Sequence, residues 1–203
     1  MERDKIIDFV KNMELRDHVV LLYTNPEDKR DCLFTYLKAG LDRGQAVAYV
    51  TSQESTDDIK KAMAQFDIDV ERCEQRGALR VIDYRDWYMI GGDFDISNTM
   101  GLWRKLLEAS KTKGFKGLRV AGEMGCFFER DMVDKLMEYE HALHRVLDVP
   151  MMAICAYDVN LFTKKEWFNV LIELLNTHST TIMLGQKGLG VVRPNEILVK
   201  VAL

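Results

Sequence analysis

Residues 114–124 read Gly114-Phe115-Lys116-Gly117-Leu118-Arg119-Val120-Ala121-Gly122-Glu123-Met124, and this segment decides the fold of the 203-residue chain. It predicts an apolar strand bounded by glycines, with Arg119 inside it and Glu123 at its carboxyl end. We expect it to be the fourth strand along the chain and the most central strand of a parallel sheet. Ligands of open α/β sheets bind beyond the carboxyl ends of the strands, so Glu123 is predicted either to take part in chemistry or to hold a ligand.

The pattern of a buried strand followed by an amphipathic helix recurs along the sequence. Apolar runs at 18–23, 46–51, 79–82 and 151–157 predict four more strands, and helices are expected between them, after a first helix at 2–15. The last of these helices is expected at 164–177, and glycines in the tail predict a hairpin over 181–201. The expected fold is therefore α/β. It is a three-layer sandwich with a mostly parallel sheet of about five to seven strands, helices on both faces and a C-terminal β-hairpin.

We divide the chain into an N-terminal amphipathic helix (1–16), one domain (17–180) and a hairpin packed on that domain (181–203).

The formal net charge of −4 argues against direct binding to nucleic acid or to an anionic membrane. Apolar runs are shorter than a membrane span, and the N-terminus lacks the apolar core of a signal peptide, so we expect a cytoplasmic protein. The four cysteines have no CxxC spacing, which favours reduced thiols.

Parallel strands would bring a rim of polar and aromatic side chains to one edge of the sheet. This rim consists of Tyr23, Gln53, Glu54, Glu123, Tyr157 and Asp158. Helical spacing also places Glu140 in the middle of an apolar helix face, with Tyr139 at the edge of that face. A buried carboxylate needs a partner. Two interpretations remain open: a structural Arg119–Glu140 pair that ties helix to sheet, or a ligand cavity lined by Arg119, Glu123 and Glu140.

Cysteine and histidine residues give weaker signals. Cys126 is either a reactive thiol near the rim or part of the core, and Cys155 is expected to be a small core residue. His178 is expected to be a core histidine close to His18, at the edge opposite the rim. Because His141 and His144 point away from Glu140, we expect no metal site.

A nucleotide-binding loop is missing where the fold would place it. Such a loop needs a glycine-rich turn between the first strand and its helix, but residues 24–29 read Thr24-Asn25-Pro26-Glu27-Asp28-Lys29. Hydrolysis of a nucleotide is therefore not expected, and neither is a bound cofactor. The long aromatic segment 83–98 is a candidate lid over the crevice.

Two families resemble this sequence. The segment 44–84 resembles the RecA-like ATPases of the KaiC group, in which two glutamates after the second strand serve catalysis; here Gln53 stands at the first position and only Glu54 matches. About residues 17–180 resemble the MEDS sensory domain, a RecA-like relative without the nucleotide loop. That resemblance rests on the segments and residues His18, Tyr23, Gly40-Leu41, Gly44, 88–94, 114–124, Tyr139-Glu140, Cys155-Ala156-Tyr157-Asp158 and His178.

The resemblance implies a non-catalytic sensory domain, archaeal or bacterial, that binds a small hydrocarbon derivative or C1-type compound. It implies a signal passed to a transcription regulator, a histidine kinase or a second copy of the chain. The expected ligand-binding residues are Tyr23, Gln53, Glu54, Arg119, Glu123, Cys126, Tyr139, Glu140, Tyr157 and Asp158, with His18, Cys155 and His178 as secondary candidates. The alternative is a degenerate ATPase, or an enzyme that uses Glu123 or Cys126 on a small substrate.

Overall fold

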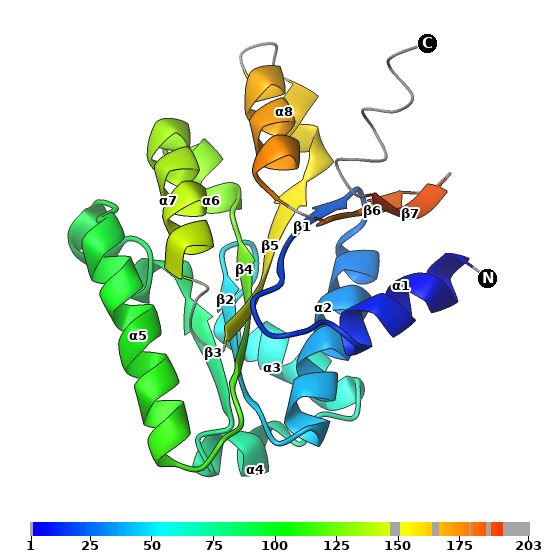
Figure 1. Cartoon of the computed structure of the whole chain (residues 1–203), viewed down its shortest axis with the longest axis vertical. Helices are drawn as coiled ribbons and strands as arrows, with labels where there is room; N and C mark the ends of the chain where they lie inside the picture. Colours follow the sequence, from blue (N-terminus) through cyan, green and yellow to red (C-terminus); the bar gives the residue numbers. More distant parts are fainter. Residues whose placement is uncertain (1, 147–150, 164–166, 179, 186–187, 193–203) are drawn as a thin grey trace.

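A single mixed sheet organises the described part of the chain (Figure 1). The computed structural model describes residues 2–146, 151–163, 167–178, 180–185 and 188–192. In these ranges seven strands lie in the order β3-β2-β4-β5-β1-β6-β7, with β7 antiparallel to β6 and all other neighbours parallel. The strands are β1 (His18–Tyr23), β2 (Ala46–Thr51), β3 (Leu79–Asp83), β4 (Leu118–Glu123), β5 (Met151–Asp158), β6 (Thr180–Gly185) and β7 (Gly188–Val192).

Helices cover both faces of the sheet, so the predicted three-layer α/β sandwich is confirmed (Figure 1). One layer holds α1 (Glu2–Lys11), α2 (Pro26–Asp42), α3 (Thr56–Gln65) and α4 (Val70–Gln75). The other holds α5 (Ile96–Thr112), α6 (Gly125–Glu129), α7 (Val133–Val146) and α8 (Phe168–Thr177). Short 3-10 turns lie at Tyr84–Asp86, Ile90–Gly92 and Val159–Thr163. None of the helices in the described ranges has the length and apolar character needed to span a membrane.

Strand alternation assigns each buried side chain to one of the two layers. In β4, Val120 packs in the core under α5 to α8, whereas Ala121 packs in the core under α1 to α3. Successive side chains of a strand point to opposite faces, so Arg119 and Glu123 share the α1–α3 side with Ala121. The same rule places Cys155 and Tyr157 of β5 on the α5–α8 side.

Several elements differ from the sequence-based expectation. The strand at the middle of the seven is β5, and β4 lies beside it, because β6 adds a parallel strand next to β1. Helix α1 ends at Lys11 rather than at residue 15. The apolar spacing of the helix expected at 164–177 predicts that Phe168 is buried, but its side chain is 56 % exposed on α8. The hairpin is present as β6 and β7, while 164–166 and 193–203 lie outside the described residues.

The aromatic segment 83–98 belongs to the core. Trp87, Tyr88 and Phe94 are buried under the α5–α8 layer, and the ring of Phe94 packs edge-on against Phe127 with centroids 4.8 Å apart. The Tyr88 hydroxyl lies against Gly122 of β4, where a Cβ would collide with it. The segment predicted to be a lid therefore packs its aromatic side chains into the core next to β4.

Gly40 allows the guanidinium of Arg119 to lie between α2 and the sheet. A Cβ at Gly40 would lie 2.7 Å from Arg119 Cδ and 3.0 Å from Val47 Cγ1. Since both neighbours are buried, the clash could not be relieved by moving a side chain into solvent. Gly40 is therefore required by the close approach of α2 to Arg119.

We predict that Gly40→Ala lowers the free energy of unfolding by about 1–3 kcal/mol, the usual cost of overpacking a core. Gly101→Ala on α5 is the matched control, because its Cβ would meet nothing within 4 Å. Alanine is favoured over glycine inside a helix by about 1 kcal/mol, so the control is expected to be neutral or stabilising. Urea unfolding of both variants measures the difference. Equal stability of the two variants would contradict the packing described here.

Candidate functional site

Two clusters of buried polar side chains lie on opposite faces of the central strands. We call the first the lysine–glutamate cluster; it comprises Lys29, Tyr49, Thr51, Glu123 and the loop 52–54, on the α1–α3 side. The second, the histidine–glutamate cluster, comprises His18, Glu140, Cys155, Tyr157 and His178, on the α5–α8 side. Of the residues that the sequence placed on a single rim, Gln53, Glu54 and Glu123 therefore belong to the first cluster and Tyr157 belongs to the second.

The lysine–glutamate cluster is organised by one buried ion pair. Lys29 Nζ lies 2.6 Å from Glu123 Oε1, and both side chains are almost fully buried. Tyr49 donates its hydroxyl to the same oxygen at 2.6 Å. The other oxygen, Oε2, accepts from the backbone N–H groups of Ser52 (2.7 Å) and Gln53 (2.9 Å), and Thr51 Oγ1 lies 3.3 Å from it. Both carboxylate oxygens of Glu123 are thus satisfied by the protein itself.

These contacts decide the protonation state of Glu123. Burial alone would raise the pKa of this carboxyl, but the charge and hydrogen bond of Lys29, with those of Tyr49 and the Ser52 N–H, hold it below its usual range. The carboxylate is therefore ionised and balanced by the ammonium group. Lys29 sits in the first turns of α2, which Pro26 begins and Asn25 caps by accepting from the Glu27 N–H.

The loop 52–54 closes the cluster at the carboxyl edge of the sheet. Gln53 Oε1 accepts from Tyr23 (2.7 Å) and from Lys29 (3.0 Å), and Arg30 Nε donates to Glu54 Oε1 at 3.2 Å. Burial, followed by the charge of Glu123, raises the pKa of the Tyr23 hydroxyl, which stays protonated. Asp158 of β5 pairs in register with Tyr23. The structure therefore assembles five of the predicted rim residues, namely Tyr23, Gln53, Glu54, Glu123 and Asp158.

The histidine–glutamate cluster joins two strands and two helices that are far apart in the sequence. His18 begins β1, Glu140 lies on α7, Cys155 lies in β5 and His178 caps the end of α8. Glu140 Oε2 lies 3.2 Å from Nε2 of His18 and 3.2 Å from Nε2 of His178. The two histidine Nε2 atoms are 3.2 Å apart, and Cys155 Sγ is 3.3 Å from His18 Nε2. The predicted proximity of His18 and His178 is confirmed.

Hydrogen bonds and nearby charges also set the protonation state of the Glu140 carboxyl. Burial would raise the pKa of its carboxyl, but His178 and His18 hold the pKa well below its usual range. Tyr157 donates its hydroxyl to Glu140 Oε1 in a short hydrogen bond. Burial and the adjacent carboxylate raise the pKa of Cys155 well above its usual value, so its thiol is protonated in the absence of a bound cation.

Arg119 belongs to neither cluster, so both open interpretations are wrong: the structural Arg119–Glu140 pair, and the cavity lined jointly by Arg119, Glu123 and Glu140. Its guanidinium lies on the α1–α3 side, where it donates to the carbonyl oxygens of Val10 (3.1 Å) and Tyr36 (3.2 Å) and to Gln45 Oε1 (2.7 Å). Glu140 lies on the opposite face of the sheet. Arg119 is also four residues before the carboxyl end of β4, so it ties α1 and α2 to the sheet instead of lining the crevice.

Three further predicted ligand residues lie in the core of the α5–α8 side. Tyr139 accepts a hydrogen bond from Trp103 Nε1 at 2.7 Å, and Tyr157 is bound to Glu140. Cys126 is 1 % exposed, and burial, then the charge of Glu129, raises its pKa to about 12. A buried, protonated thiol is a poor nucleophile, so this geometry does not support a reactive Cys126. His141, in contrast, is exposed and lies 3.0 Å from Glu173.

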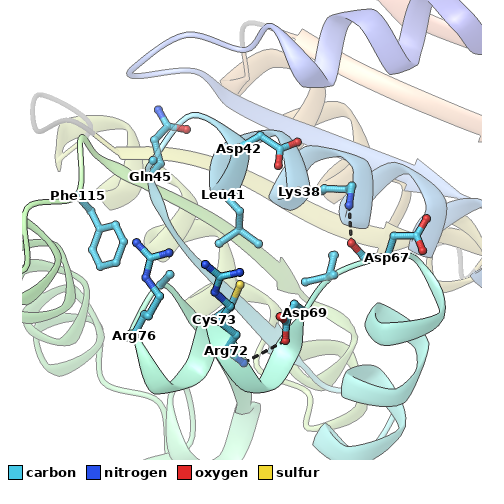
Figure 2. Close-up of a pocket in the computed structure, with 13 residues that line it drawn as sticks. Lys38, Leu41, Asp42, Gln45, Asp67, Asp69, Arg72, Cys73, Arg76 and Phe115 are labelled. Carbon is cyan, nitrogen blue, oxygen red and sulfur yellow. Dashed lines mark hydrogen bonds between the residues drawn. The ribbon is translucent and has the colours of Figure 1, made fainter.

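Two surface hollows in the described structure lie away from both clusters. The one in Figure 2 has a volume of about 320 Å³ and lies near α4, with Arg72 and Arg76 facing Asp42 and Lys38 (Figure 2). Arg72 N–H donates to Asp69 as part of the cap of α4, and Lys38 donates to the Asp67 carbonyl. A second hollow, of about 300 Å³, lies between α1 and α2. Neither hollow is lined by a predicted ligand residue.

Lys29 and Tyr49 are the functional residues that sequence reasoning missed. Their strand and helix positions were predicted correctly, but a lysine in a first helical turn ordinarily faces solvent. The signal that could have found Lys29 is the unpaired Glu123, since a buried carboxylate at the end of β4 needs a cation from a neighbouring element.

The sheet order and its two helical layers define an α/β class of fold, and comparisons with known proteins show which family has it. The sequence model of the family described as MEDS, MEthanogen/methylotroph, DcmR Sensory domain, matches residues 17–179. The chain belongs to this family. Among solved structures, it is similar to a KaiC-like protein from the hyperthermophilic archaeon Pyrococcus horikoshii, with a TM-score of 0.60 and 16 % sequence identity over 87 % of this chain and 77 % of that one. No curated protein matches the sequence.

Because Lys29 and Glu123 neutralise each other in the interior, removing one should cost more than removing both charges. We predict that Lys29→Met or Glu123→Gln alone lowers the free energy of unfolding by about 3–5 kcal/mol. The double variant should cost less than the sum, with a coupling of about 1–3 kcal/mol. The exposed pair Lys61–Asp58, 3.5 Å apart, is the control and should show no measurable coupling. Additive effects at Lys29 and Glu123 in urea unfolding would contradict the ion pair.

The depressed pKa of Glu123 also predicts a dependence of stability on pH. A carboxyl whose pKa is lower in the folded state contributes stability above its unfolded pKa, about 4.3, and loses that contribution as pH falls through the folded pKa. The stability advantage of the native chain over the Lys29→Met/Glu123→Gln double variant should therefore shrink as pH is lowered from about 6 to 3. Urea unfolding across this range measures it, and a constant difference would show that Glu123 is not the titrating group.

Proposed function

We propose that this chain is a non-catalytic, cytoplasmic sensor of a small hydrocarbon derivative or C1-type compound, which binds at the carboxyl edge of the sheet. Its membership in a sensory-domain family supports the sensory role. The observation that carries the proposal is the closure of the lysine–glutamate cluster by the loop 52–54. That loop is the part of the site that a ligand at the edge would meet first.

The contacts of this loop can be exchanged for contacts with a ligand. Gln53 is exposed at the surface, and its Oε1 holds both Tyr23 and Lys29. The buried hydroxyl oxygen of Ser52 has no hydrogen-bond partner among the described residues. A small molecule with one oxygen acceptor could replace Gln53 on Lys29 and accept from Ser52. The loop leads directly into α3, which Ser55 caps by accepting from the Asp58 N–H, so its displacement would be transmitted to that helix.

The internal ion pair favours sensing over nucleotide hydrolysis. A phosphate-binding lysine must be free to reach the phosphates, whereas Lys29 is 2.6 Å from Glu123 and fully buried. Pro26 removes a backbone N–H from the start of α2, and Glu27 and Asp28 add negative charge there. The alternative enzyme, with Glu123 or Cys126 as its reacting group, is disfavoured because the first is fully hydrogen-bonded and the second is a protonated, buried thiol.

A sensor of this kind would pass its signal to a partner protein. Phe168 and Ile172, one helical turn apart on α8, are 56 % and 43 % exposed. We infer that this apolar pair contributes to contact with a transcription regulator, a histidine kinase or a second copy of the chain. Direct binding to nucleic acid is disfavoured by the net charge of −4.

Thermal unfolding with a panel of probes tests the ligand site. Methanol, methylamine, formaldehyde, formate, dichloromethane and ATP with Mg²⁺ are added separately to the full chain. We predict that at least one C1 probe raises the midpoint, by about 5–10 °C at a hundredfold excess over its Kd. Ser52→Ala, which deletes the hydroxyl that would donate to the ligand, should remove most of this shift. Gln75→Ala, at an exposed glutamine that donates to Glu71 at 3.1 Å, should keep it.

Two results would contradict the proposal. One is the absence of a shift with every C1 probe at millimolar concentration. The other is steady ATP hydrolysis that Glu54→Gln abolishes, which would favour the degenerate ATPase instead.

A further inference from the structure

The donor atoms of the histidine–glutamate cluster converge on one point. His18 Nε2, His178 Nε2 and Glu140 Oε2 are each 3.2 Å from the other two, and so form a nearly equilateral triangle. An ion bound tetrahedrally to three atoms at this spacing would lie about 2.0 Å from each, which matches zinc–nitrogen and zinc–oxygen bonds. Cys155 Sγ, 3.3 Å from His18 Nε2, lies within 4.8 Å of the Glu140 ligand atom and is the candidate for a fourth donor.

A second observation concerns the orientation of one histidine ring. His178 Nδ1 lies 2.9 Å from the carbonyl oxygen of Leu174, which can only accept a hydrogen bond. Nδ1 therefore carries a proton, and Nε2 is the ring nitrogen directed at the cluster. Metal-binding histidines are commonly held in this way, with the other ring nitrogen donating to a backbone carbonyl.

Glu140 is held in a matching way. Tyr157 donates to Oε1, which fixes the carboxylate and leaves Oε2 directed at the two histidines. A lone pair on His178 Nε2 and a carboxylate oxygen would repel each other at 3.2 Å, so either the proton of a histidine N–H or a metal ion must lie between the three atoms. The spacing and the thiol favour the metal.

We propose that His18, Glu140 and His178, with Cys155, bind one divalent transition-metal ion of the zinc or iron(II) class. Two imidazoles and a carboxylate suit either ion, and a thiolate favours zinc. On binding, the Cys155 thiol loses its proton to solvent and its sulfur donates a lone pair to the ion, so no oxidant or reductant is needed. The site is independent of the ligand site proposed at the carboxyl edge, because it lies on the opposite face of the sheet.

The sequence concealed this site for a clear reason. The three elements that carry it are β1, α7 and the end of α8, with Cys155 from β5, so no short motif joins the ligands. The histidines close to Glu140 in the sequence are His141 and His144, and neither is one of the proposed ligands. His141 is exposed, and the side chain of His144 is outside the described part of the structure.

Metal analysis of the full chain tests the proposal. The chain is produced in media supplemented with zinc, iron(II) or cobalt(II) salts in turn, and bound metal is counted by mass spectrometry after desalting. We expect about one equivalent per chain in the zinc or the iron arm, which identifies the ion. Loss of a residue that only hydrogen-bonds to a metal ligand lowers metal affinity about 10–100-fold. His178 and Glu140 are proposed to be ligands themselves, so His178→Ala and Glu140→Gln should lower metal occupancy at least about tenfold. His141→Ala, next to Glu140, is the control and should keep full occupancy.

The absorption spectrum of the cobalt-loaded wild-type chain provides a readout that does not depend on whether a variant folds. We expect d–d bands of a four-coordinate ion and a thiolate-to-cobalt charge-transfer band, the latter lost in Cys155→Ala and retained in Cys126→Ala. A folded wild-type chain that binds no more zinc, iron or cobalt than His178→Ala, and shows no cobalt bands, would overturn the proposal. The cluster would then be a proton-bound histidine–glutamate pair.

Discussion

The buried ion pair between Lys29 and Glu123 is the interaction on which the rest of the structure depends. It joins α2 to the carboxyl end of β4, and the same carboxylate holds the backbone of the loop that follows β2. Three neighbouring elements are therefore tied to one charged group in the interior. A buried pair of this kind is not a strong source of stability by itself, because desolvation offsets most of the attraction. Its consequence is specificity: neither partner can be exposed or lost without leaving a buried charge.

Strand alternation explains why one sheet carries two unrelated polar clusters. Glu123 and Arg119 of β4 point toward α1 to α3, whereas Cys155 and Tyr157 of the adjacent β5 point toward α5 to α8. The cluster under α1 to α3 reaches the carboxyl edge through the loop 52–54, which suits a ligand that arrives from solvent. The histidine–glutamate cluster is enclosed by the aromatic core and by the end of α8, which suits a tightly held ion. Helix α8 links this second cluster to the exposed Phe168 and Ile172, so the same helix could report the state of the interior to a partner.

Apolar runs and capping residues predicted the strands, most helices and the layered architecture, because these features depend on local patterns. The rim was predicted in part: Tyr23, Gln53, Glu54, Glu123 and Asp158 share an edge, as parallel strands require. The partners of the buried charges could not be predicted. Arg119 was matched with Glu140 because both are charged and were expected to be buried. Which face of the sheet each side chain points to depends on the strand register and on the strand order, in which β4 lies between β2 and β5. Lys29 was missed altogether, and His178 was predicted to lie near His18 but without a carboxylate partner; only the tertiary arrangement shows that they contact Glu123 and Glu140.

The central claim is that Glu123 is an internal counter-ion of Lys29, and that the protein itself satisfies both oxygens of its carboxylate. A carbon-13 NMR titration of the Glu123 carboxyl, in the full chain with and without ATP and Mg²⁺, tests this most directly. The account predicts a pKa below the usual glutamate range and a resonance that does not move when nucleotide is added. A pKa at or above the usual range, or a resonance that shifts on binding of nucleotide and metal, would contradict it.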